Sequence, residues 1–120
     1  MHRLVRAGLM VQGSFYVLTG VWPLVSMRTF EAVTGPKVDD WLVQMVGLLA
    51  AVIGTVLLMA LRAGRAHELL PLAAGSAASF AAIDLRYGLS GRISPIYLAD
   101  AVVELGFLAI AGLAWRRLSR

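Results

Sequence analysis

The sequence contains no cysteine, which excludes disulfide bonds, thiolate metal sites and thiol chemistry. Charged residues are scarce as well: they make up 15% of the 120 residues, against about 25% in ordinary soluble domains. Hydrophobic residues account for 59%, and the mean hydropathy is +0.78. Because a small globule has too much surface to bury so large an apolar share, a soluble domain is disfavoured. Disorder is disfavoured too, since it requires low hydrophobicity.

Motifs of nucleotide-binding and hydrolytic enzymes are also missing from the sequence. No glycine-rich phosphate loop follows a strand, and no nucleophile elbow is present. The two histidines, His2 and His67, lack companion ligands, so we expect no metal or haem site and no cofactor. The net charge of +4 comes from basic residues scattered between apolar runs. Without a basic stripe carrying interleaved aromatic residues, we expect no nucleic-acid partner.

Four segments of the chain are long and apolar enough to cross a bilayer, which takes roughly 20 mostly apolar residues. Short links join them, and short links force neighbouring helices to run antiparallel. Thr34-Gly35-Pro36 interrupts the longest link, residues 27–40, where Asp39 or Asp40 is placed to cap the second span. The sequence therefore predicts an all-α, integral membrane four-helix bundle of up-down-up-down topology, as a single domain over 1–120. The predicted spans are residues 4–26, 41–61, 69–87 and 95–115.

The distribution of arginine and lysine over the short links predicts the orientation of this bundle. Of the 11 basic residues, seven fall on the side that holds both chain ends and the link between the second and third spans. We therefore expect a multi-pass protein of a cell inner membrane with both termini in the cytoplasm and the lipid bilayer as its partner. Aromatic rings then fall near the interfaces, the depth that amphipathic rings prefer. These rings are Trp22, Trp41, Tyr87, Tyr97 and Trp115.

Small residues recur at four-residue spacing in the second and third spans. Gly47 and Ala51 form one such pair, and Ala73, Ala77 and Ala81 form a longer stripe. Small side chains let helix backbones approach each other closely in lipid, so we interpret the stripes as packing faces. Whether they serve a monomer, a homodimer or a contact with another membrane protein stays open.

Three acidic residues, Asp84, Asp100 and Glu104, lie within the predicted spans. A charge at the centre of a membrane helix costs roughly 2.5–3.5 kcal/mol, so such residues are functional candidates. Asp100 and Glu104 are four residues apart and share one helix face. At about 1.5 Å per residue they lie roughly 8 Å and 14 Å below the outer end of the fourth span, and Asp84 lies about 5–6 Å below the outer end of the third. We expect the three carboxyl groups to be the reactive groups of the protein.

Polar residues on the first two spans and in the loops extend this candidate site. We predict a polar interior that opens toward the outside and is roofed by the first link. Three crowded carboxylates cannot all stay ionised in a low dielectric, so we expect at least one, with the deep Glu104 first, to hold a proton. An ion pair between Arg86 and Asp84 or Asp100 is the structural alternative. The predicted ligand-binding residues are Tyr16, Thr19, Gln44, Arg86 and Glu31.

Three stretches of the chain resemble a known family. They are GSFYVLTGVWPL, with two glycines seven residues apart before a proline, the glycine-rich VGLLAAVIGTVLL, and the acidic DAVVELGFL. Together they resemble the DoxX-like small four-span bacterial membrane proteins. The resemblance implies a four-helix membrane bundle, in some relatives an accessory subunit of quinone-linked redox systems, and assigns no catalytic residue.

Three functions stay open on the sequence. The first is an outward-open pocket that binds or transports a small cation, a proton-coupled solute or a lipophilic ligand, favoured because the acids converge without a recognisable catalytic set. The second is a small intramembrane enzyme whose paired carboxyls perform acid–base chemistry on an isoprenoid- or quinone-like substrate. The third is an accessory subunit whose acids pair with another protein's helices.

Overall fold

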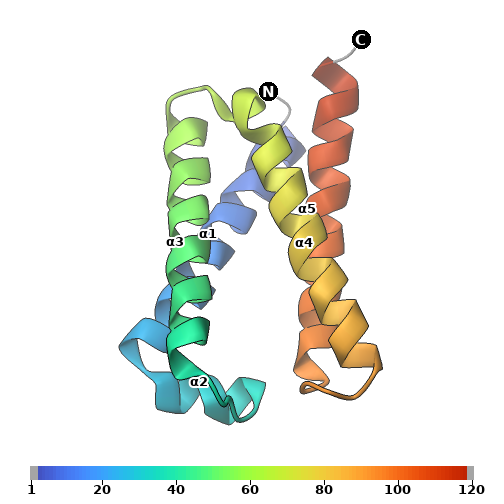
Figure 1. The fold of residues 1–120 in the computed structure, drawn as a ribbon. Helices are drawn as coiled ribbons and strands as arrows, with labels where there is room; N and C mark the ends of the chain where they lie inside the picture. Colours follow the sequence, from blue (N-terminus) through green and yellow to red (C-terminus); the bar gives the residue numbers. More distant parts are fainter. Residues whose placement is uncertain (1–2, 119–120) are drawn as a thin grey trace.

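The computed structural model describes residues 3–118, and this part of the chain is helical apart from short links (Figure 1). Four of its helices are long and apolar enough to cross a membrane, which indicates a multi-pass membrane protein. The predicted all-helical class is confirmed for these residues, and each predicted span coincides with one helix to within a few residues. The elements are α1 (Arg3–Val25), α2 (Met27–Thr34), α3 (Asp40–Arg62), the 3-10 helix η1 (Ala66–Leu69), α4 (Leu70–Leu89) and α5 (Ile96–Leu118).

The link at residues 27–40 is not the plain loop that the sequence predicted, because it contains the helix α2. Ser26 caps this helix: its hydroxyl accepts a hydrogen bond from the Thr29 backbone N–H at 3.3 Å. The Trp22 indole donates to the Thr29 hydroxyl at 2.9 Å, and the Trp22 ring packs edge-on against Phe30 at 5.3 Å. The cap was hidden in the sequence because Ser26 directly follows the apolar run and looks like its last residue.

The C-terminal end of α2 is fixed by a glycine and a lysine. Gly35 adopts a φ of 96°, a left-handed value that suits glycine, and its N–H bonds the Glu31 carbonyl. The Lys37 ammonium donates to the carbonyls of Thr34 and Gly35 at 3.0 and 2.9 Å. It also lies 5.0 Å from the centre of the Tyr97 ring on α5. These contacts hold the link against the start of α5. Asp39 occupies the N-cap position of α3, as the sequence predicted, but its side chain makes no capping hydrogen bond.

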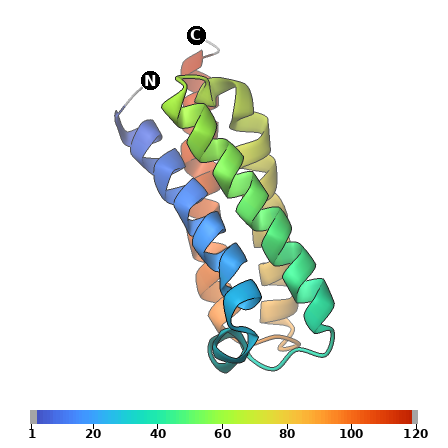
Figure 2. The same ribbon diagram turned by 90° about the vertical axis from the view of Figure 1, so that its left-hand side faces the viewer.

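The four long helices pack as two pairs, α1 with α3 and α4 with α5. Figure 2 shows α1 and α3 side by side in front of the other pair. In Figure 1 both chain ends and the α3–α4 connection lie at one end of the bundle, and α2 lies at the other. Contacts between α1 and α5 join the two pairs. The contacts of α1 with the α4–α5 pair therefore help to hold the two halves of the bundle together.

Glycine at two crossing points allows α1 and α3 to pack backbone to backbone. A Cβ on Gly54 would clash with the carbonyl oxygen of Gly13, and a Cβ on Gly20 would clash with that of Gly47. Such close approach is how helices associate in lipid, where no hydrophobic force drives them together. The alanine stripe of α4 serves the same purpose, since Ala73 and Ala77 are completely buried.

Replacing Gly54 by alanine should destabilise the bundle by about 1–3 kcal/mol, because the added methyl overpacks the crossing with α1. Gly106→Ala on α5 is the matched control, since a Cβ there meets nothing within 4 Å. Both substitutions gain the same helix propensity, so their difference isolates the clash. Reversible unfolding in detergent, followed by circular dichroism, measures it. Equal stabilities of the two variants would contradict the glycine contact.

Candidate functional site

A chain of buried hydrogen bonds connects three of the four long helices. The Tyr16 hydroxyl of α1 donates to Glu104 Oε1 of α5 at 2.7 Å. The Gln12 side-chain amide, one turn away on α1, donates to the Tyr16 hydroxyl at 3.2 Å and to the Ala73 carbonyl of α4 at 2.9 Å. Glu104 is 2% exposed, and Gln12 and Tyr16 are each 1% exposed. The deepest predicted acid is therefore enclosed by protein and held in place by a donor.

Aromatic rings surround this polar chain and isolate it from its surroundings. The Tyr16 ring packs edge-on against Phe80 of α4 at 5.3 Å and against Phe107 of α5 at 6.0 Å. Phe15 packs against the same Phe107 at 5.8 Å. Apolar walls strengthen the hydrogen bonds they enclose, because the local dielectric is low. The Tyr16–Glu104 hydrogen bond thus links α1 to α5 and also fixes the position of the Glu104 carboxyl in the site.

Asp84 and Asp100 form the second part of the site, nearer to the end of the bundle that carries α2. Asp84 is buried on α4, and its Oδ2 atom has no hydrogen-bond partner among the described residues. The Asp100 carboxyl of α5 lies close enough to interact directly with Asp84, and Glu104 lies near both. Asp100 is half-buried, so it is the most accessible of the three. The structure thus brings together the three acids that the sequence singled out.

No cation of residues 3–118 neutralises this cluster. Among these residues Arg65 and Glu68 form an ion pair at 2.9 Å, and this pair lies near the opposite end of the bundle. Arg86 is exposed, and its guanidinium lies 5.6 Å from the centre of the neighbouring Tyr87 ring. The expected alternative, an ion pair between Arg86 and Asp84 or Asp100, is therefore not formed.

The other predicted ligand-binding residues do not join the cluster. The Thr19 hydroxyl donates to the Phe15 carbonyl of its own helix at 2.7 Å. Gln44 is half-buried on α3 and makes no hydrogen bond to the acids among the described residues. Gln12, in contrast, belongs to the site and was not predicted as a lining residue. The signal was its position one turn before Tyr16 on the same face of α1.

Glu31 lies outside the long helices, in α2, where the sequence placed a roof. Its pKa is raised, first because the Asp40 carboxyl interacts with its side chain and then because of partial burial and the Asp40 charge. Lys37 opposes this effect. Arg28, three residues earlier, is exposed and forms no ion pair with Glu31. Glu31 interacts instead with Asp40 at the start of α3.

The geometry of the acids limits which ions they can hold. No group of three or more His, Asp or Glu side chains in residues 3–118 is arranged to ligate a metal ion. Hard divalent cations take six or more oxygen ligands, whereas a proton is held by one or two oxygen atoms. A groove of about 350 Å³ lies between α3 and α4, and none of the three acids lines it.

No protein-family model, curated protein or solved structure matches the chain. Because a fold alone does not specify a function, the function has to be argued from the chemistry of the site.

Replacing Tyr16 by phenylalanine should cost about 1–3 kcal/mol of unfolding free energy, because a buried carboxyl loses its donor while the ring packing is kept. The substitution Glu104→Gln and the double variant complete a thermodynamic cycle. Since the two side chains contact each other directly, the cycle should give a coupling of at least about 0.5 kcal/mol. Additive effects would show that the Tyr16–Glu104 bond does not stabilise the bundle.

The substitution Asp40→Asn should lower the pKa of Glu31, because it removes the carboxylate that opposes ionisation. NMR titration of the Glu31 carboxyl carbon measures the change, and Asp39→Asn is the control. The raised value also means that the contribution of Glu31 to stability is present at acidic pH and is lost as the pH rises through its folded pKa. An unchanged Glu31 titration in Asp40→Asn would rule out the contact.

Proposed function

We propose that this protein is an inner-membrane carrier that binds protons and a small monovalent cation at Asp84, Asp100 and Glu104. In this proposal the bundle is a single up-down-up-down transmembrane domain with both termini in the cytoplasm, and ligand enters from the outside. The observation that carries the proposal is a cluster of three carboxyl groups within the apolar helices, without a cationic partner in residues 3–118.

Electrostatics requires positive charge at this cluster. An uncompensated charge inside a membrane protein is costly, and such groups pair, neutralise or face water. The described residues offer no pair, so the charge has to come from outside the chain, as protons or as a bound cation. A single proton shared between Asp84 and Asp100 would give the unpartnered Asp84 Oδ2 a hydrogen bond and remove one negative charge. Exchange of that proton for a cation is the simplest reaction that this site supports.

The three acids differ in accessibility, which suggests an order of events. Asp100 is half-buried and receives the ligand first, while Asp84 shares it from the facing helix. Glu104, one turn deeper, is held by Tyr16. From Glu104 the hydrogen bonds continue through Tyr16 and Gln12 toward Ala73, near the start of α4. These bonds extend the polar interior of the bundle from the acids to the buried Ala73 carbonyl, while the proposed exchange takes place at Asp84 and Asp100.

The alternatives make different demands on the same residues. An intramembrane enzyme needs a lipophilic substrate to turn over at Asp84 and Asp100, and an accessory subunit needs a second protein that supplies the missing cation. A membership of the DoxX-like group stays a prediction from the sequence. A reaction product in lipid extracts, or a stoichiometric membrane partner, would favour these alternatives over a carrier.

Flux into liposomes tests the proposal. The reconstituted protein should transport protons, followed with an entrapped pH dye, and exchange them for labelled sodium or methylammonium. Asp84→Asn and Asp100→Asn should each reduce the rate at least about tenfold, because each removes a charged contact worth about 1.5–3 kcal/mol. Glu68→Gln, an exposed acid near the opposite end, is the control and should leave the rate unchanged.

Three results would contradict a carrier. They are wild-type flux equal to that of empty liposomes, unchanged flux in both aspartate variants, and an equal loss of flux in Glu68→Gln.

A further inference from the structure

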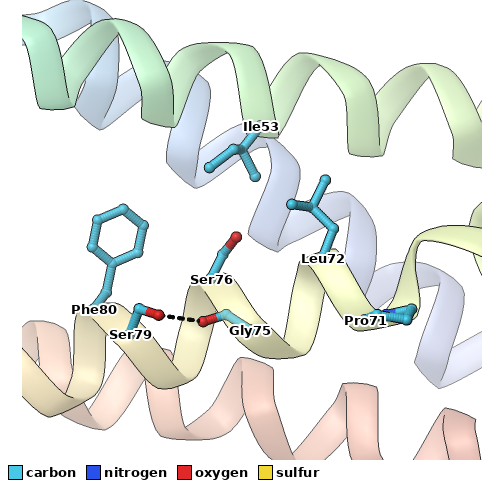
Figure 3. Close-up of a pocket in the computed structure, with 7 residues that line it drawn as sticks. All are labelled: Ile53, Pro71, Leu72, Gly75, Ser76, Ser79 and Phe80. Carbon is cyan, nitrogen blue, oxygen red and sulfur yellow. Dashed lines mark hydrogen bonds between the residues drawn. The ribbon is translucent and has the colours of Figure 1, made fainter.

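The groove between α3 and α4 is a second candidate site, separate from the acids. Ile53 of α3 faces Leu72 and Phe80 of α4 across it, and Pro71, Gly75, Ser76 and Ser79 complete its lining (Figure 3). The Ser79 hydroxyl donates to the Gly75 carbonyl at 2.7 Å, so it offers little polarity to a ligand. The groove exists because α3 packs on α1 and α4 packs on α5, while α3 and α4 meet chiefly through η1.

The dimensions of the groove match a single hydrocarbon chain. Its α4 lining runs from Pro71 to Phe80, and the nine rises of about 1.5 Å between these two residues make roughly 14 Å of helix. The hydrocarbon core of a bilayer is about 30 Å thick, so one leaflet is about 15 Å. The groove begins in the first turn of α4 and ends near the middle of that helix. It therefore spans one leaflet, from the end of the bundle with the α3–α4 connection to the midplane.

That end of the bundle is strongly basic. Arg62 is the last residue of α3, the helix that contributes Ile53 to the groove, and it is exposed. Among the described residues the acid at this end is Glu68, which is paired with Arg65. The opposite end carries charges of both signs, because the acidic residues Glu31, Asp39 and Asp40 accompany the basic ones there. The basic residues at the groove end are Arg3, Arg6, Arg62, Arg65, Arg116 and Arg117.

We propose that this groove binds an acyl chain of an anionic phospholipid, with the lipid phosphate at the arginine-rich end. The mostly apolar lining of the groove favours an acyl chain, and the length of the groove matches one leaflet. The arginines at its end favour a negatively charged lipid headgroup. Basic surfaces beside membrane helices attract anionic lipids by about fivefold for each arginine near the headgroups. The site is independent of the carboxylate cluster, although the Phe80 ring that lines it also packs against Tyr16.

Lipid retention by the full-length protein tests this site. Protein purified in detergent is mixed with phosphatidylglycerol or phosphatidylcholine of identical chains, and bound lipid is counted by native mass spectrometry. Wild type should retain phosphatidylglycerol at least about fivefold better. Gly75→Leu should lose this lipid, because a Cβ at Gly75 meets nothing within 4 Å and the leucine fills the groove. Arg62→Gln should reduce the preference for phosphatidylglycerol about fivefold.

Gly112→Leu on α5 is the matched control, since a Cβ there also meets nothing within 4 Å and the residue lies outside the groove. It should retain phosphatidylglycerol as wild type does. Should Gly75→Leu fail to fold, Ser79→Leu fills the same groove from an exposed position. Equal retention of the two lipids, full retention in the groove-filling variant, or equal loss in Gly112→Leu would overturn the proposal. The last result would mean that lipid binds over the whole helix surface.

Discussion

The hydrogen bond from Tyr16 to Glu104 is the interaction on which the rest of this bundle depends. The molecule consists of two helix pairs, and α1 joins the other pair mainly through α5, with a further hydrogen bond from Gln12 to Ala73 of α4. Apolar packing alone gives little selectivity between helices in lipid, because lipid tails are as apolar as the side chains. A buried carboxyl that finds its donor on the opposite pair fixes both the register and the depth of the contact. The three acids themselves lie within the other pair, Asp84 on α4 and both Asp100 and Glu104 on α5, so the bond ties α1 to the helix that carries two of them.

The consequence of this arrangement is an excess of negative charge inside an apolar bundle. Structural acids are normally accompanied by a cation or by several donors, and Glu104 has one donor while Asp84 Oδ2 has none in residues 3–118. Folding tolerates such a site when protons or an external cation complete it. The unpartnered Asp84 Oδ2, which the packing of the helices leaves without a donor, is thus the atom at which we expect a proton or a cation to bind. The end of the bundle with the α3–α4 connection carries an excess of positive charge instead, and its exposed Arg62 suits an anionic lipid.

Much of this follows from the sequence, because hydropathy and small-residue spacing determine helices and their close contacts. The four spans, the burial of Ala73 and Ala77, and the convergence of three acids on one region were all predicted. The helix α2 was missed because its cap, Ser26, is continuous with an apolar run. The role of Gln12 depends on which carbonyl of α4 lies opposite, and the isolation of Arg86 depends on helix rotation. The groove depends on how far α3 and α4 diverge, and a sequence does not specify such tertiary distances.

The central claim is that positive charge from outside the chain balances the membrane carboxyls. Isotope-edited infrared spectroscopy of the cation-free protein at neutral pH measures it directly, because protonated and ionised carboxyl groups absorb separately. The account predicts a protonated carboxyl signal that disappears when Asp84→Asn, Asp100→Asn and Glu104→Gln are combined and diminishes when a transported cation is added. Three fully ionised carboxylates in the cation-free protein would contradict it.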